Sequence, residues 1–360
     1  STNVLNHADG VRYVGAMKDI TVLMPHYRAN PYQRLLADAL ARQGVRTFLV
    51  SHWDAIDPRT LLRVRPQVLH LQWLEPYYSR SNAFSSFCTT VAFLVALLSL
   101  RIVGVRIVWT VHNVHHHERR YPALNALTNH GVAMLSHAVV THSASIKHVV
   151  CPDMHLRPDK VAIIPAGNFC NYRNDIGRAQ ARTLLGLPAN AFVFLFLGHL
   201  RRYKGVDALI ETFKTLRGEE LRLVVAGERA DDTYMRRLSA LARHDDRVMV
   251  RGGFIADDEI QTFMNACDVV VLPYVAIDSS GSLLLAMSFG KPCICPVIGS
   301  IPETIGDARL LYDPHDKQGL WKALSGATQR SDLVEIGTRN LEKARTFDWD
   351  IVAVQTKDVY

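Results

Sequence analysis

The stretch that decides the fold runs from Val193 to Gly205 and reads Val-Phe-Leu-Phe-Leu-Gly-His-Leu-Arg-Arg-Tyr-Lys-Gly. Its first five residues are apolar and predict a buried strand, and Gly198 predicts a turn of the backbone at the strand's end. A basic loop with Arg201 and Lys204 follows, and a helix with apolar residues at helical spacing comes next. A glycine turn and a helix start with fixed positive charge favour an anion site, although an ordinary strand–helix connection has the same pattern.

A second candidate anion site lies at residues 273–282, before a predicted helix from Leu283 to Phe289. Ser279 or Ser280 suits the N-cap of this helix, and Tyr274 precedes it. The backbone N–H groups of the first turn have no partner within the helix and point out of its start. We expect Ser280, Gly281 and Ser282 to bind a diphosphate together with Arg201 and Lys204.

Short apolar runs alternate with helical patterns along the whole chain, which predicts two parallel, doubly wound α/β sheets. The strands expected in the first half are Ile20–Met24, Val45–Val50, Val68–Trp73, Arg106–Val111, Ala138–Thr141 and Val161–Ile164. Those expected in the second half are Phe192–Leu197, Leu221–Ala226, Val248–Val250, Val269–Leu272, Pro292–Cys295 and Leu310–Tyr312. A linker is expected over Ala166–Asp175, and ligands are expected at the carboxyl ends of the strands.

The net charge of +7 is placed unevenly along the 360 residues. Residues 1–166 hold 17 Lys and Arg against 9 Asp and Glu, and residues 167–360 hold 24 against 25. The first half is therefore expected to meet something anionic, and a membrane surface or a phosphate-bearing substrate fits. No basic stripe with interleaved aromatic residues is present, so we expect no nucleic-acid partner. The six scattered cysteines indicate reduced thiols in the cytoplasm, and no signal peptide is expected.

One segment, Ala83 to Leu100, carries no charge over 18 residues and lies between two predicted strands of one sheet. It has three interpretations: a buried crossover helix, a helix at the membrane interface, or, least compatible with the sheet, a membrane span. In the second interpretation, Phe93 and Leu97 are expected to contact lipid.

Four residues in the first half have side chains suited to proton transfer. His112 leaves a predicted strand, and His117 and Glu118 follow in the next loop. Glu75 leaves the preceding strand. A histidine or carboxylate there can accept the proton of an attacking hydroxyl, and the imidazole can alternatively bind a sugar hydroxyl. The run His115–His117 invites a metal interpretation, and His112 and His116 have the i, i+4 spacing of a helix-borne site. Because these two histidines span a strand end and a loop, we expect no metal.

Taken together, several short motifs resemble GT-B nucleotide-sugar glycosyltransferases of the broad family 4. The motifs are Gly198–Gly205, Ala226–Glu228, Gly252–Phe254, Leu272–Tyr274, Gly290–Pro292 and Ile301–Glu303. The resemblance implies that Arg201 and Lys204 neutralise the donor diphosphate and that the base lies near Gly227, Glu228 and Phe254. It also implies two Rossmann-like domains with a cleft between them.

A glutamate pair that is usual in family 4 is missing, since its positions fall on Ile277 and Leu285. The stretch Ser280–Ser288 is instead similar to bacterial exopolysaccharide glycosyltransferases related to the β-mannosyltransferase of xanthan assembly. Motifs of the first half agree and imply acceptor-side residues Asn30, Tyr32, Trp73 and Asn113.

The expected domains are a flexible lead-in at 1–17, an acceptor-side domain at 18–166, a nucleotide-sugar domain at 167–345, and a helix at 346–360 that crosses back to the first domain. The expected activity is metal-independent transfer of a hexosyl unit from a GDP- or UDP-linked sugar to a saccharide, lipid-linked acceptor. The enzyme is expected in the cytoplasm, at the inner membrane face. The alternative is a catalytically silent nucleotide-sugar-binding subunit.

Overall fold

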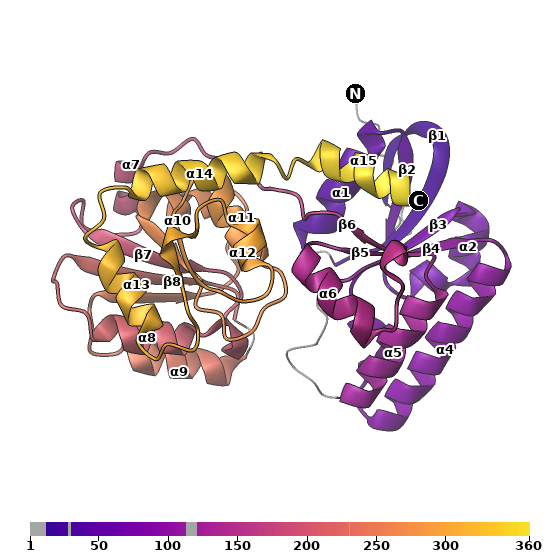
Figure 1. Cartoon of the computed structure of the whole chain (residues 1–360), viewed down its shortest axis with the longest axis horizontal. Helices are drawn as coiled ribbons and strands as arrows, with labels where there is room; N and C mark the ends of the chain where they lie inside the picture. The colour runs from indigo at the N-terminus through magenta and orange to yellow at the C-terminus, as the bar shows by residue number, and fades with distance from the viewer. Residues whose placement is uncertain (1–11, 28–29, 113–120, 230) are drawn as a thin grey trace. The chain divides into compact units, whose positions relative to one another are not determined.

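The computed structural model describes residues 12–27, 30–112, 121–229 and 231–360. It divides the chain into two compact units (Figure 1). Unit 1 comprises the chain up to Gly167 together with Phe347–Tyr360, and unit 2 comprises Asn168–Thr346. Each unit is built on one six-stranded sheet in which every pair of neighbouring strands is parallel. The prediction of two parallel, doubly wound α/β sheets is confirmed.

The sheet of unit 1 has the strand order β2-β1-β3-β4-β5-β6. Its strands are β1 (Arg12–Pro25), β2 (Val45–Val50), β3 (Val68–Leu71), β4 (Arg106–Thr110), β5 (Ala138–Thr141) and β6 (Val161–Ile163). The first strand begins at Arg12, so it extends into the segment expected to be a flexible lead-in. The order reverses between β1 and β3, which sets the carboxyl ends of these strands where an open parallel sheet binds its ligands.

Helices cover both faces of the unit 1 sheet (Figure 1). Successive side chains of β1 point to opposite faces of the sheet and are apolar on both: Leu23 packs on one face, and Val22 and Met24 pack on the other. The helices and 3₁₀ turns are α1 (Pro31–Arg42), η1 (Asp54–Ile56), α2 (Pro58–Val64), α3 (Glu75–Tyr78), α4 (Ala83–Ile102), α5 (Pro122–Leu135), α6 (Ala144–Asp153), η2 (Pro158–Lys160) and α15 (Trp349–Val359).

Helix α4 is the uncharged segment, and it forms the crossover between β3 and β4. Asn82 caps it by accepting a hydrogen bond from the Ser85 backbone N–H. Phe93 and Leu97 are fully buried in the core, so the expectation that they contact lipid is wrong. By length and composition α4 is the one helix among the described residues that is suited to cross a membrane, and 28% of its apolar window is buried.

The exposed face of α4 is apolar along its whole length. Its exposed apolar residues recur every three or four positions and therefore lie on one side of the helix: Phe84, Phe87, Val91, Val95, Leu98 and Ile102. We call this set the α4 stripe. One side of the helix is therefore core, as the crossover interpretation expects, and the other side is exposed.

The C-terminal helix α15 packs on α1 within unit 1. Trp349 is buried against Gly167, where an added Cβ would lie 2.2 Å from the indole. Asp348 caps the helix, and Asp350 pairs with Arg42 at 2.7 Å. The two exposed aspartates thus begin the helix, and the tryptophan between them belongs to the core.

The sheet of unit 2 has the order β12-β11-β10-β7-β8-β9. Its strands are β7 (Phe192–Leu197), β8 (Leu221–Gly227), β9 (Val248–Gly252), β10 (Val269–Val271), β11 (Cys293–Pro296) and β12 (Leu311–Tyr312). Its helices are α7 (Arg178–Leu184), η3 (Arg202–Lys204), α8 (Val206–Lys214), α9 (Asp232–Ala242), α10 (Ile260–Ala266), α11 (Gly281–Ser288), α12 (Ile301–Thr304), η4 (Ala308–Leu310), α13 (Gly319–Ala327) and α14 (Leu333–Arg345).

Candidate active site

In unit 2, the carboxyl ends of β7 and β8 approach so closely that both need glycine. Gly198 has φ +154°, and a Cβ added to it would lie 2.7 Å from Ser282 Oγ. Gly227 has φ +145°, and its Cβ would lie 1.8 Å from the Gly198 carbonyl oxygen. The two glycines therefore bring the strand ends against the start of α11 and leave a surface of backbone groups and one hydroxyl.

Lys204 is the buried cation of this region. It lies at the end of η3 and is 8% exposed. Its Nζ lies 4.2 Å from the centre of the Tyr274 ring and 5.2 Å from that of Tyr203. Burial, with a smaller repulsion from Arg201, lowers the pKa of Lys204 to about 7. A buried ammonium surrounded by aromatic faces and another cation is stabilised by an incoming anion.

The start of α11 is built as a donor site for hydrogen bonds. Ser280 is its N-cap, and Ser280 Oγ accepts from the Leu283 backbone N–H at 3.1 Å and lies 2.7 Å from the Tyr274 hydroxyl. Burial raises the pKa of Tyr274, so its phenol stays neutral and able to donate. A Cβ added at Gly281 would touch nothing, so the first turn of α11 is open on that side. Of the two serines expected as the N-cap, Ser279 and Ser280, it is therefore Ser280 that caps α11.

The remaining donor-side candidates lie after β8 and β9. Glu228 follows β8, and its Oε2 lies 3.3 Å from His199 Nδ1. Phe254 follows β9 and is 68% exposed. An exposed aromatic side chain beside a glycine-rich strand end is available for contact with a planar ring. All these donor-side candidates lie in unit 2, in the segments that follow its strands.

In unit 1, His112 lies just past β4 and stacks on Trp73. The ring centres are 4.0 Å apart and the planes differ by 8°. Tyr32, at the start of α1, packs its ring edge-on against both of them and against Trp349. Asn30 caps α1 by accepting from the Tyr32 N–H at 3.0 Å, so its side chain has a structural task. Asn113, His117 and Glu118 lie outside the described residues.

His112 belongs to a chain of hydrogen bonds that occupies both ring nitrogens. His142 Nδ1 lies 2.9 Å from the Ile164 carbonyl oxygen, which can only accept, so this nitrogen carries a hydrogen. In a neutral His142, Nε2 then accepts from His112 Nδ1–H at 3.2 Å. His112 Nε2 is left as an acceptor, 3.1 Å from Gln72 Oε1. A half-turn of the amide gives up the contact from Gln72 Nε2 to Met24 Sδ at 3.4 Å, but it presents Nε2–H to His112 and completes the chain.

If the Gln72 amide keeps its oxygen toward His112, a protonated His112 can donate to both partners. The environment of His112 disfavours this charged form. Burial lowers the pKa of His112 well below its usual range, and His142 and His70 add to the effect. Burial also lowers the pKa of His142. Both rings are therefore neutral at pH 7, and His112 has no ring nitrogen left to accept a proton from an acceptor hydroxyl without breaking the chain.

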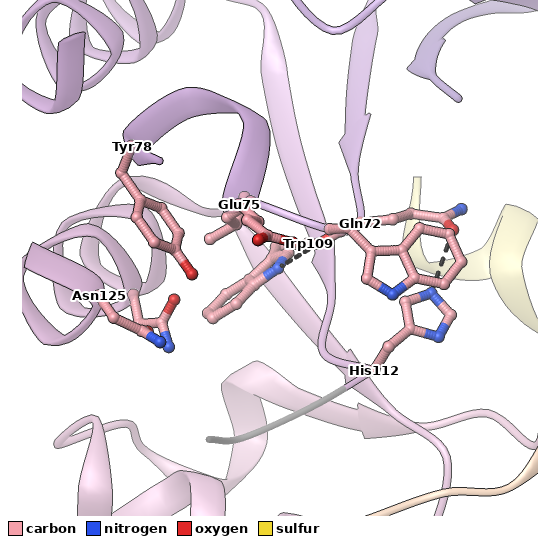
Figure 2. Close-up of a pocket in the computed structure, with 9 residues that line it drawn as sticks. Gln72, Glu75, Tyr78, Trp109, His112 and Asn125 are labelled. Atoms are coloured by element: carbon pink, nitrogen blue, oxygen red, sulfur yellow. Dashed lines mark hydrogen bonds between the residues drawn. The ribbon is translucent and has the colours of Figure 1, made fainter. Parts of the chain in front are cut away.

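Glu75 begins α3 and lines a pocket at the carboxyl ends of β3 and β4 (Figure 2). The Trp109 indole N–H donates to the Gln72 carbonyl at 3.0 Å and so fixes one wall. The figure shows the side chains of Glu75, Tyr78 and Asn125 pointing toward one another beside this indole. The full lining is Gln72, Trp73, Leu74, Glu75, Tyr78, Trp109, His112, Asn125 and Asn129.

The pocket adds residues that the sequence analysis did not single out: Gln72, Tyr78, Trp109, Asn125, Asn129, and His142 behind it. The position of Gln72 near the end of a predicted strand, beside Trp73, indicates a site residue. The two asparagines had only one signal, their spacing of four residues on a predicted helix. Among the described residues no group of three or more His, Cys, Asp or Glu is placed to hold a metal ion, and His115–His117 lie outside them.

Comparisons with known proteins agree with this architecture. Residues 191–329 match the family described as "Glycosyl transferases group 1". The chain is 26% identical to a GDP-mannose:glycolipid 4-beta-D-mannosyltransferase of Xanthomonas campestris pv. campestris over 295 residues, which cover 79% of this chain and 76% of that protein. It is 29% identical to a D-inositol 3-phosphate glycosyltransferase of Streptomyces scabiei over 56% of this chain and 49% of that protein.

Solved structures share the fold of the whole chain. Sucrose-phosphate synthase from Thermosynechococcus elongatus has a TM-score of 0.75 with 17% identity, and the match covers 95% of this chain and 98% of that one. Anabaena HepE in complex with UDP and glucose has a TM-score of 0.72 with 18% identity, covering 94% and 99%.

Proposed function

We propose that this chain, which belongs to the GT-B glycosyltransferases and carries a group 1 glycosyltransferase domain, moves a hexosyl unit from a GDP- or UDP-linked sugar to a lipid-linked saccharide. One of the relatives described above, the mannosyltransferase of Xanthomonas campestris, acts by its name on a glycolipid with a GDP-sugar. The xanthan-type resemblance of the motifs supports a place in bacterial polysaccharide or glycolipid synthesis.

The observation that carries the proposal is the anion site of unit 2. Lys204, Arg201 and the start of α11 lie among the segments that follow the unit 2 strands, and the buried ammonium has aromatic faces around it. In the proposed reaction the bond between the sugar carbon and the diphosphate oxygen breaks, and negative charge grows on the diphosphate. Lys204, Arg201 and the N–H groups of α11 stabilise that charge, which is the contribution usually made by a bound cation, so the proposal requires no metal.

Unit 1 supplies the acceptor side. We assign the proton-accepting role to Glu75, because it lines the pocket and, unlike His112, is not part of the chain of imidazoles. His112 is then a positioning residue that holds Trp73 by stacking. Exchanging Glu75 for Gln is expected to lower turnover by about 100-fold or more while nucleotide binding is kept. His112→Gln is expected to act mainly on KM for the acceptor.

The donor site is tested by thermal unfolding with GDP-, UDP-, ADP- and TDP-sugars in the presence of EDTA. A ligand that binds only the folded protein raises the melting temperature, so one nucleotide class is expected to raise it for the wild type and not for Lys204→Met. Lys214→Met, at the far end of α8, is the matched control and is expected to keep the shift. An absence of any shift with any donor contradicts the donor site. Product formation in the same samples separates an enzyme from the silent subunit considered above.

We further place the enzyme in the cytoplasm, with unit 1 resting on the anionic inner face of the membrane. The α4 stripe is apolar, Arg80 and Arg101 stand before and within α4, and the first half of the sequence is basic. An apolar face with cations beside it suits an anionic lipid surface, which also holds a lipid-linked acceptor.

Sedimentation with phosphatidylcholine vesicles that contain about a third phosphatidylglycerol tests this placement. Phe84→Glu with Phe87→Glu puts two charges on the stripe and is expected to release the protein from the vesicles. Leu62→Glu changes an equally exposed leucine on α2, outside the stripe, and is expected to leave sedimentation unchanged. Equal sedimentation of the double variant and the wild type contradicts the placement.

A further inference from the structure

Two asparagines on α5 stand out in the pocket of unit 1. Asn125 and Asn129 are four residues apart, lie on the same side of the helix and both line the pocket. Figure 2 labels Asn125. Both are half-buried. Among the described residues neither side-chain amide has a hydrogen-bond partner, although each offers two N–H donors and a carbonyl acceptor.

The stability of the fold does not explain why these two positions carry amide side chains. Asparagine favours helix interiors less than alanine does, and a half-buried amide without a protein partner gains nothing from the fold. By contrast, Thr128 and Ser136, on the same helix and at its end, donate their hydroxyls to backbone carbonyls of α5. The two amides are therefore set apart from the other polar residues of α5 as groups that await a partner from outside the protein.

The remaining walls of the pocket determine the class of that partner. Trp73 and Trp109 offer aromatic surface, and Glu75 and Tyr78 offer a carboxylate and a phenol. The pKa of Tyr78 is raised by burial and by Glu75, so the phenol remains protonated. A pyranose ring has the matching surface, because its C–H faces pack on aromatic rings and its hydroxyls both donate and accept hydrogen bonds. A planar amide or carboxylate can form hydrogen bonds with two adjacent hydroxyls of such a ring.

We infer that Asn125 and Asn129 form the subsite that binds the terminal hexose of the acceptor and orients one of its hydroxyls toward Glu75. This inference rests on the proposed function, and it adds the residues that determine which acceptor is accepted. Glu75, Tyr78 and Asn125 already point toward one another, so a ring hydroxyl bound by the amides lies beside the carboxylate that accepts its proton.

The test is a titration of the full chain with methyl α- and β-glucopyranosides and mannopyranosides, followed by tryptophan fluorescence. Trp73 and Trp109 line the pocket, so a bound hexoside changes their emission. The wild type is expected to show saturable binding of at least one hexoside. Asn125→Ala and Asn129→Ala are each expected to weaken it by about fivefold, and the double variant by tenfold or more, since each removes hydrogen bonds to the ligand.

Stability measurements separate this role from a structural one. Because alanine favours the helix, both variants are expected to melt at or above the wild-type temperature while binding is lost. Ala126→Asn places an asparagine on the exposed side of the same helix and is expected to leave hexoside binding unchanged, while the melting temperature falls slightly because asparagine favours a helix less than alanine does. Wild-type protein that binds none of the four hexosides, or Asn variants that bind as the wild type does, would overturn the inference. The thermal shift with nucleotide sugars is independent of α5, so the proposed function is judged separately.

Discussion

His70, in β3, makes unit 1 sensitive to acid. Its side chain is 1% exposed, with Nδ1 2.7 Å from the Tyr360 hydroxyl and Nε2 2.8 Å from Thr110 Oγ1. Burial, with a smaller repulsion from His142, lowers the pKa of His70 from 6.5 to about 3. In the unfolded chain the same imidazole binds a proton below pH 6.5. The unfolded state therefore binds more protons between pH 6.5 and about 3, and stability falls as the pH falls through that window.

The size of the effect at pH 5 follows from the unfolded state alone. A pH of 5 lies about 1.5 units below the pKa of the unfolded imidazole. Each pH unit corresponds to about 1.4 kcal/mol of protonation free energy. Lowering the pH from 7 to 5 therefore removes about 2 kcal/mol of stability through His70. The result does not depend on how far below 5 the folded pKa lies. His52, whose pKa burial lowers to about 4, as well as His112 and His142, add losses of the same sign.

Urea unfolding at pH 7 and pH 5, followed by tryptophan fluorescence, measures this loss. Four of the five tryptophans lie in unit 1, so the signal reports mainly on that unit. His70→Gln keeps a polar side chain without a titrating group, and its loss between the two pH values is expected to be smaller than the wild-type loss by about 2 kcal/mol. His148→Gln, at an exposed position on α6, is the control and is expected to follow the wild type. Equal pH dependence of His70→Gln and wild type would refute the reasoning.

Three further outcomes concern unit 2. Gly227→Ala puts a methyl group against the Gly198 carbonyl and is expected to cost about 3 kcal/mol or more in urea unfolding. Gly281→Ala meets no protein atom, so it is expected to keep the fold and weaken nucleotide diphosphate binding in calorimetry; Gly326→Ala, equally unobstructed on α13, should change neither. Because the pKa of Lys204 is about 7 in the free protein, raising the pH from 7 to 8.5 is expected to weaken diphosphate binding about tenfold, and Lys204→Met should flatten that dependence.

Much of the fold was predictable because the strands of a doubly covered sheet are continuous apolar runs. Phe192–Leu197, Val45–Val50 and Ala138–Thr141 have the bounds expected of them. The first strand did not, since the run Tyr13–Met17 that precedes its expected start contains Gly15 and is separated from Ile20 by two charged residues. The start of α11 was also predictable, because a serine before an apolar run signals an N-cap whatever the tertiary structure.

The acceptor side was less predictable, because its chemistry depends on contacts between strands. His112 was a sound candidate for a proton acceptor from its place at a strand end. Only the structure shows that His142 and Gln72 occupy its two ring nitrogens. In the same way, the composition of α4 could not tell which side is core. Helical spacing places Phe93 and Leu97 on one side, but the identity of the buried side depends on what α4 packs against.

At the two positions where family 4 usually has a glutamate pair, this chain has apolar residues, so its proposed donor site has fewer negative charges than the family pattern. Ile277 is 7% exposed and packs within unit 2, and Leu285 is half-buried on α11. A carboxylate at the first position would have to be buried in an apolar environment, which is costly. In the proposed donor site, apolar side chains at both positions leave neutral hydroxyls and backbone N–H groups at the α11 start to bind the donor alongside the charge of Lys204 and Arg201. Such a site attracts the diphosphate more strongly than the sugar, because the sugar carries no charge for it to neutralise.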